Sequence, residues 1–127
     1  LLLIIFIFIS ISYSIEFIDN KLIKAVEEKY GIFAKNRFES LQKLILELQH
    51  KEEKVILEKV NDFFNKVDYS TDEDTYDLKD YWATPFEFLA RDEGDCEDYA
   101  IAKYLLLKLF FKERIKIIWI FSYYFTN

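Results

Sequence analysis

The run of residues 97–112 is apolar on almost every side of a helix, and this run constrains the fold more than any other feature. A surface helix has a single apolar face, whereas a helix that is apolar all round is packed on all sides. We therefore expect a central helix here. Its start is well marked, because Asp95 is a favourable N-cap and Asp98, three residues later, completes a pair that resembles a capping box.

Cys96, the only cysteine, would be the first residue of this helix. Unpaired backbone N–H groups and the helix dipole at that position stabilise the thiolate, which is the nucleophilic form. The alternative is a small buried structural cysteine. The flanking acids Asp95, Glu97 and Asp98 oppose thiolate formation through their negative charge. A Ca²⁺ ion on oxygen ligands from Asp95, Glu97 and Asp98 would offset that charge, or the acids cap the helix and face water.

Three further apolar stripes with helical spacing precede the acidic part of the chain, and each predicts a helix. The stripes are Leu22, Ile23, Val26 and Tyr30, ending at Gly31; Leu41, Leu44, Ile45 and Leu48; and Ile56, Val60, Phe63, Phe64 and Val67. Residues 68–81 should form a loop that closes on Trp82 and Pro85, which either line a cleft or pack against the cysteine helix. Residues 114–125 are rich in β-branched and aromatic side chains and predict a strand.

Negative charge is concentrated in residues 68–98, which hold twelve acids and two bases, net −10, in a chain of net charge −6. This concentration argues against nucleic-acid binding and favours a bound cation. The spacing of Asp72, Asp74 and Asp77 does not match an EF-hand. A solvated acidic loop at residues 72–74 is an equal alternative.

Residues 1–9 are apolar without a break and are followed by Ser10, Ser12 and Ser14. We expect residues 1–14 to be a secretory signal peptide without its basic start, or an N-terminal anchor, and residues 15–127 to form one partial domain. The apolar run is too short to span a bilayer comfortably, so no stable membrane span is expected once the signal is removed. A single cysteine cannot form an internal disulfide, so an oxidising compartment is neither required nor excluded.

Three segments, 60–65, 80–89 and 94–104, resemble the bacterial transglutaminase-like cysteine peptidases, periplasmic proteases that release biofilm adhesins. Arg37 and residues 29–31 also fit the first helix of that family. The resemblance implies an α+β fold of the papain-like or transglutaminase-like type, of which this chain keeps mainly the helical N-terminal half plus one strand. It also implies a Cys–His–Asp triad with Cys96 as the nucleophile, and calcium bound by Asp95 and Glu97.

The histidine and aspartate of that triad are expected downstream of the cysteine, yet residues 97–127 contain no histidine and only one aspartate, Asp98. The single histidine, His50, lies 46 residues before Cys96 and is expected at the surface. A cysteine peptidase needs a base to activate the thiol and protonate the leaving amine. We therefore expect an incomplete active site.

The predicted function is the N-terminal part of an exported, periplasmic, calcium-dependent cysteine endopeptidase that is inactive as it stands. The resemblance implies a large adhesin as the substrate and an inner-membrane cyclic-di-GMP receptor as a further partner. Two alternatives stay open: a non-catalytic calcium-binding or receptor-titrating module, and an unproductive gene fragment. The gene sequence beyond residue 127 would discriminate among these interpretations. A downstream His and Asp intact in another reading frame would indicate a lesion or a sequencing error in an active enzyme.

Overall fold

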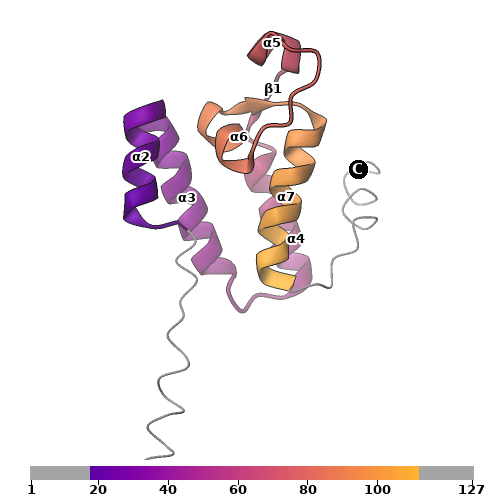
Figure 1. Cartoon of the computed structure of the whole chain (residues 1–127). Helices are drawn as coiled ribbons and strands as arrows, with labels where there is room; N and C mark the ends of the chain where they lie inside the picture. The colour runs from indigo at the N-terminus through magenta and orange to yellow at the C-terminus, as the bar shows by residue number, and fades with distance from the viewer. Residues whose placement is uncertain (1–17, 112–127) are drawn as a thin grey trace, which may run out of the picture.

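The computed structural model describes residues 18–111, which form a helical bundle with a small parallel sheet at one end (Figure 1). The predicted signal peptide or anchor at residues 1–14 and the predicted strand at 114–125 lie outside the described residues. The helices are α2 (Asn20–Tyr30), α3 (Ile32–Leu48), α4 (Glu53–Phe64), α5 (Asp72–Tyr76), α6 (Pro85–Arg91) and α7 (Cys96–Phe111), and the strands are β1 (Asp68–Tyr69) and β2 (Glu93–Gly94).

Helices α2 and α3 form a hairpin joined by one residue, Gly31. The Asp19 side chain caps α2 by accepting a hydrogen bond of 2.7 Å from the Leu22 N–H. Gly31 ends α2 at φ 89°, a left-handed conformation that side chains with a Cβ disfavour. The three helices predicted from the apolar stripes are thus confirmed as α2, α3 and α4.

Helix α6 lies between the α2–α3 hairpin and the pair formed by α4 and α7 (Figure 1). Its Phe88 is fully buried, as are Phe38 of α3, Val60 of α4 and Leu107 of α7. Phe88 contacts Phe64 of α4, with ring centroids 6.2 Å apart. These side chains make one continuous core, so the short helix α6 holds the two halves of the bundle together.

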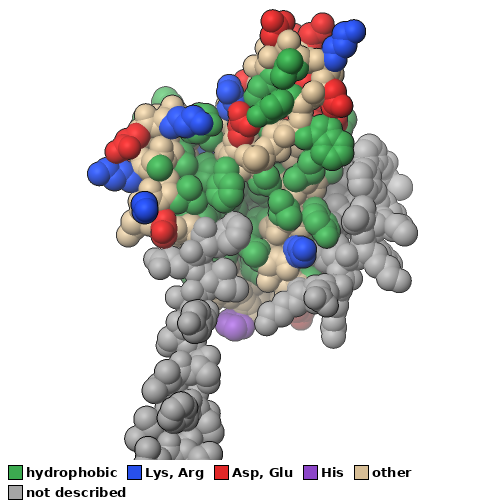
Figure 2. Space-filling model, in the orientation of Figure 1, with side chains coloured by type: hydrophobic (Ala, Val, Ile, Leu, Met, Phe, Trp, Pro, Cys, Tyr) green, Lys and Arg blue, Asp and Glu red, His purple; other side chains and the backbone are tan. Residues whose placement is uncertain are grey.

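Helix α7 begins at Cys96, as the capping signals predict. It packs against α4 and α6, but in the described part of the chain Leu105 on another face is 42% exposed. Packing on all sides, which the apolar sequence predicts, is therefore not seen among residues 18–111. The apolar side chains along α7 are visible in Figure 2.

Strands β1 and β2 run parallel, with Asp68 opposite Glu93 and Tyr69 opposite Gly94. The Ser70 N–H donates to the Gly94 carbonyl at 2.9 Å. Because α4 leads into β1 and α7 follows β2, the strand pair sets these two helices antiparallel. The prediction of a loop over residues 68–81 is wrong in part, since β1 and α5 lie within it, and both are too short to leave a periodic pattern.

The described chain is mostly helical with one two-stranded sheet, consistent with the α+β class. None of the helices within residues 18–111 combines the length and the apolar character needed to cross a membrane.

Candidate functional site

Cys96 is exposed at the first position of α7. The alternative of a small buried structural cysteine is therefore wrong. The first N–H groups of a helix have no intrahelical acceptor, so the sulfur lies beside free backbone donors and the positive end of the dipole. This end of the molecule is acidic, and Figure 2 shows Asp and Glu side chains gathered over α5.

Asp98, one of the predicted metal ligands, is 1% exposed, and its carboxylate accepts hydrogen bonds from the backbone. Its carboxylate accepts hydrogen bonds from the Ala83 N–H at 2.9 Å and the Asp95 N–H at 3.3 Å. The second bond is one half of the predicted capping pair. Burial raises the pKa of Asp98, and the two backbone hydrogen bonds act in the opposite direction.

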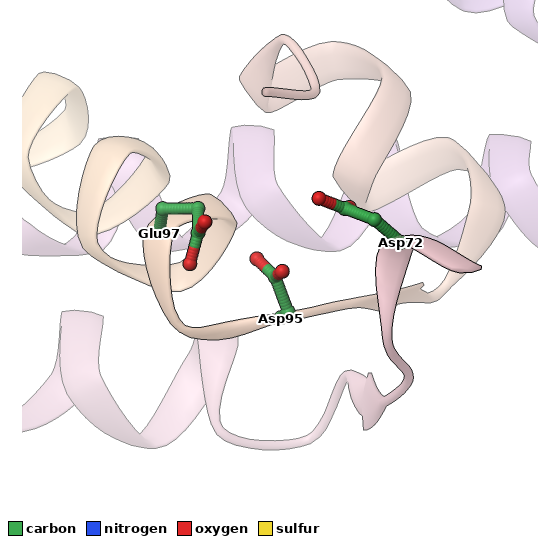
Figure 3. A group of neighbouring side chains, drawn as sticks. All are labelled: Asp72, Asp95 and Glu97. Atoms are coloured by element: carbon green, nitrogen blue, oxygen red, sulfur yellow. The ribbon is translucent and has the colours of Figure 1, made fainter. Parts of the chain in front are cut away.

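The other two predicted ligands, Asp95 and Glu97, meet a third carboxylate, Asp72 (Figure 3). One oxygen from each residue lies within 4.8 Å of the others, and in Figure 3 the three carboxylates point toward one another. They come from the start of α5, the β2–α7 junction and the first turn of α7. We call these three residues the acidic cluster.

Two oxygens of the acidic cluster are buried without a hydrogen-bond partner in residues 18–111. Asp72 is 5% exposed; its Oδ2 accepts a hydrogen bond of 2.6 Å from the Tyr81 N–H, while its Oδ1 has no partner among the described residues. The Oδ1 of Asp95 is in the same state. A buried acceptor without a partner is unfavourable by about 1–3 kcal/mol, so each needs an explanation such as an ion.

The electrostatics of the cluster also favour a cation. Burial, followed by the charges of Glu97 and Asp72, raises the pKa of Asp95 to about 6. Calcium binds oxygens at about 2.3–2.6 Å, so two ligands of one ion lie up to about 5 Å apart. The 4.8 Å spacing of the cluster is compatible with that limit. The residues present therefore fit a calcium ion.

Two exposed aromatic side chains lie in the segments that contact the start of α7. Tyr69 is 65% exposed, and the charge of the neighbouring Cys96, followed by desolvation and the charge of Asp95, raises the pKa of its hydroxyl. Trp82, which precedes Ala83, is 67% exposed and donates from Nε1 to Asp80 at 3.1 Å. Of the two alternatives for Trp82, this exposure argues against close packing on α7, and a role in a cleft stays a prediction.

Gly94 and Arg37 fix the segment that leads from α6 through β2 to Cys96. A Cβ placed on Gly94 would lie 2.5 Å from Phe88 Cδ2 and 2.7 Å from Asp98 Oδ2, so only glycine fits there. Arg37 of α3 donates to the carbonyls of Leu89 and Ala90 at 2.8 and 2.7 Å. This guanidinium satisfies the C-terminal carbonyls of α6 just before the chain enters β2.

His50 lies in the loop between α3 and α4, with φ 113°. That loop is at the opposite end of the bundle from the first turn of α7 (Figure 1). His50 is exposed, as predicted, and the structure does not bring it to Cys96.

The sequence does not identify Asp72 as a member of the acidic cluster or Tyr69 as a neighbour of Cys96. In the sequence, Asp72 is only one of several acids in an acidic segment. The parallel pairing of β1 with β2 brings Asp72 and Tyr69 close to the start of α7. This pairing joins distant parts of the chain and leaves no local motif in the sequence.

Comparison with known proteins agrees with the resemblance seen in the sequence. A family model described as bacterial transglutaminase-like cysteine proteinase matches residues 34–114. The match runs from α3 through α7 and includes Cys96, Arg37 and the acidic cluster. No curated protein matches the chain. Since the family model covers well over half of the 127 residues, the chain belongs to the bacterial transglutaminase-like cysteine proteinase family.

Proposed function

We propose that this chain carries the nucleophile and the calcium site of a cysteine endopeptidase with a papain-like or transglutaminase-like fold. The observation that carries the proposal is the exposed Cys96 thiol at the N-terminus of α7, within the span matched by the family model. The thiolate attacks the scissile carbonyl, and the amine leaves as a thioester forms on Cys96. Backbone N–H groups of the first turn of α7 are placed to stabilise the tetrahedral oxyanion.

Calcium is the proposed resident ion, held by Asp72, Asp95 and Glu97. The buried unpaired oxygens of Asp72 and Asp95 support this assignment. When bound, the ion supplies positive charge that offsets the carboxylates next to the nucleophile. The protein's own part is to hold α5 against β2, directly before the start of α7, which brings the three carboxylates together.

The reaction also needs a base, and these 127 residues place none beside Cys96. No histidine follows Cys96, and His50 lies at the far end of the bundle. We propose that Cys96 of the 127-residue chain is readily alkylated, yet the chain does not catalyse the hydrolysis of peptides. Loss of general acid–base assistance removes about 10²–10⁴-fold in rate.

The test compares carbamidomethylation of Cys96 by iodoacetamide in the native chain with calcium and in the urea-unfolded chain, using intact mass. We expect faster labelling in the native chain and none in Cys96→Ser. Slower labelling in the native chain would contradict the role of Cys96 as an activated nucleophile. Calcium-dependent cleavage of a peptide substrate that Cys96→Ser abolishes would contradict the proposed inactivity.

An exported, periplasmic location, a large adhesin as substrate and an inner-membrane cyclic-di-GMP receptor as partner complete the proposal. These three points are supported only by the family resemblance. A second candidate function is a non-catalytic calcium-binding module that titrates the receptor. It is favoured by the acidic cluster, whose three carboxylates come together without any histidine. Calcium binding without any thiol activation in the test above would favour this second function.

A further inference from the structure

Tyr69 is placed beside the nucleophile by the strand pairing. Its backbone is opposite Gly94, two residues before Cys96, and the hydrogen bond of 2.9 Å from the Ser70 N–H to the Gly94 carbonyl fixes this register. The hydroxyl is close enough to the Cys96 side chain for charge and hydrogen bonding between them to affect its titration.

Within residues 18–111, the Tyr69 side chain lies mostly outside the core. It is 65% exposed, unlike Tyr99, whose hydroxyl donates to the Val67 carbonyl and ties α7 to the end of α4. A large aromatic residue held at a reactive thiol but outside the core is available to a substrate.

Building on the proposed function of Cys96, we propose that the Tyr69 hydroxyl donates a hydrogen bond to the oxyanion formed when Cys96 adds to a substrate carbonyl. Tyr69 is then a catalytic residue that approaches the oxyanion from β1, while the backbone N–H donors approach from α7. Oxyanion sites gain most from several preorganised donors. A tyrosine hydroxyl keeps its proton at neutral pH, so Tyr69 is available as a hydrogen-bond donor.

A peptide aldehyde tests this donor without requiring a catalytic base. The Cys96 sulfur bonds to the aldehyde carbon, the C=O double bond becomes a single bond, and the thiol proton ends on the oxygen of the hemithioacetal. Iodoacetamide provides the contrast, since it reacts with the same sulfur by displacing iodide and forms no tetrahedral adduct whose oxygen would occupy the oxyanion position. Both reactions can be followed on the 127-residue chain with calcium present.

The variants are Tyr69→Phe, which removes only the hydroxyl, and Tyr104→Phe, a matched change further along α7. We expect the Kd of the aldehyde to rise about tenfold in Tyr69→Phe, the loss of one good hydrogen bond. The iodoacetamide rate should stay within about twofold of wild type. Tyr104→Phe should change neither. Circular dichroism checks that both variants keep the helical fold.

Three results would overturn the assignment of Tyr69: unchanged aldehyde affinity in Tyr69→Phe, an equal loss in both reactions, or a wild-type chain that is alkylated but binds no aldehyde. Each leaves the nucleophilic role of Cys96 intact. A wild-type chain in which neither reagent reacts at Cys96 would instead contradict the proposed function, and with it the role of Tyr69.

Discussion

The Asp98 carboxylate accepts a hydrogen bond of 2.9 Å from the backbone N–H of Ala83, and so joins the segment before α6 to the first turn of α7. The same carboxylate also accepts from the Asp95 N–H at 3.3 Å. One buried acid thus holds three segments around Cys96. Its position in the sequence suggested a metal ligand, but its oxygens are engaged by the backbone.

Asp98→Asn should destabilise the fold by about 1–3 kcal/mol, since an amide has one acceptor oxygen and its NH₂ group would face a backbone donor. Urea denaturation followed by circular dichroism measures the change. Asp62→Asn, at an exposed position of α4, is the matched control and should have little effect. Equal stability of the two variants would show that the Asp98 contacts are not important.

Without calcium, stability should fall as the pH rises from about 4 to about 6. The folded-state pKa of Asp95 is about 6, above the unfolded value near 3.9, so the folded chain binds the proton more tightly. That stabilisation is fully present below pH 4 and is lost as the pH passes 6. Because solvent screens the partly exposed Asp95 carboxylate, we expect a loss of only about 1 kcal/mol, to which Asp98, also shifted upward, contributes in the same direction.

Chemical denaturation in EGTA across this pH range measures the effect. Asp95→Asn should flatten the profile, and calcium at pH 7 should restore part of the lost stability. A wild-type profile that rises between pH 4 and 6 would contradict the prediction.

Asp72→Asn should weaken calcium binding by at least about tenfold, because it removes the charge of the most buried member of the cluster. Glu73→Gln changes the next residue of α5, which is exposed, and should leave the affinity close to wild type. Isothermal titration calorimetry of the full chain provides the affinities. Similar losses of calcium affinity in the two variants would mean that calcium binding depends on the overall negative charge of this region and not on the acidic cluster.

Gly94→Ala should destabilise the chain by about 1–3 kcal/mol through overpacking. The new Cβ would meet the ring of Phe88, which is fully buried, at 2.5 Å. A thermal melt compared with wild type measures the loss. Ala100→Gly, a change of similar size within α7, serves as a reference for a helix effect of about 1 kcal/mol. Wild-type stability in Gly94→Ala would mean that β2 can shift freely.

The sequence was sufficient to predict the features that depend on local patterns. Helical periodicity located α2, α3 and α4, and the Asp95–Asp98 pair with the following apolar run placed the start of α7 at Cys96. These signals lie within a few residues of one another, so they need no knowledge of tertiary structure.

The features that could not be predicted depend on contacts across the chain. Asp72 joins Asp95 only because β1 pairs with β2, and two-residue strands carry no recognisable period. Burial of Asp98 depends on the Ala83 N–H, 15 residues away. The sequence allows Trp82 either to line a cleft or to pack against α7, and the choice depends on tertiary contacts; the structure leaves the side chain 67% exposed.

The distance in sequence between β1 and β2 has a consequence for synthesis of the chain. Asp68 pairs with Glu93, 25 residues later, whereas α2 and α3 are joined by one glycine. We expect the α2–α3 hairpin to form as it leaves the ribosome. The ring of Phe38 can stack on Phe86 only after α6 has been synthesised. The nucleophile is therefore assembled last, and a nascent chain stalled before Gly94 would present an apolar helical hairpin to chaperones.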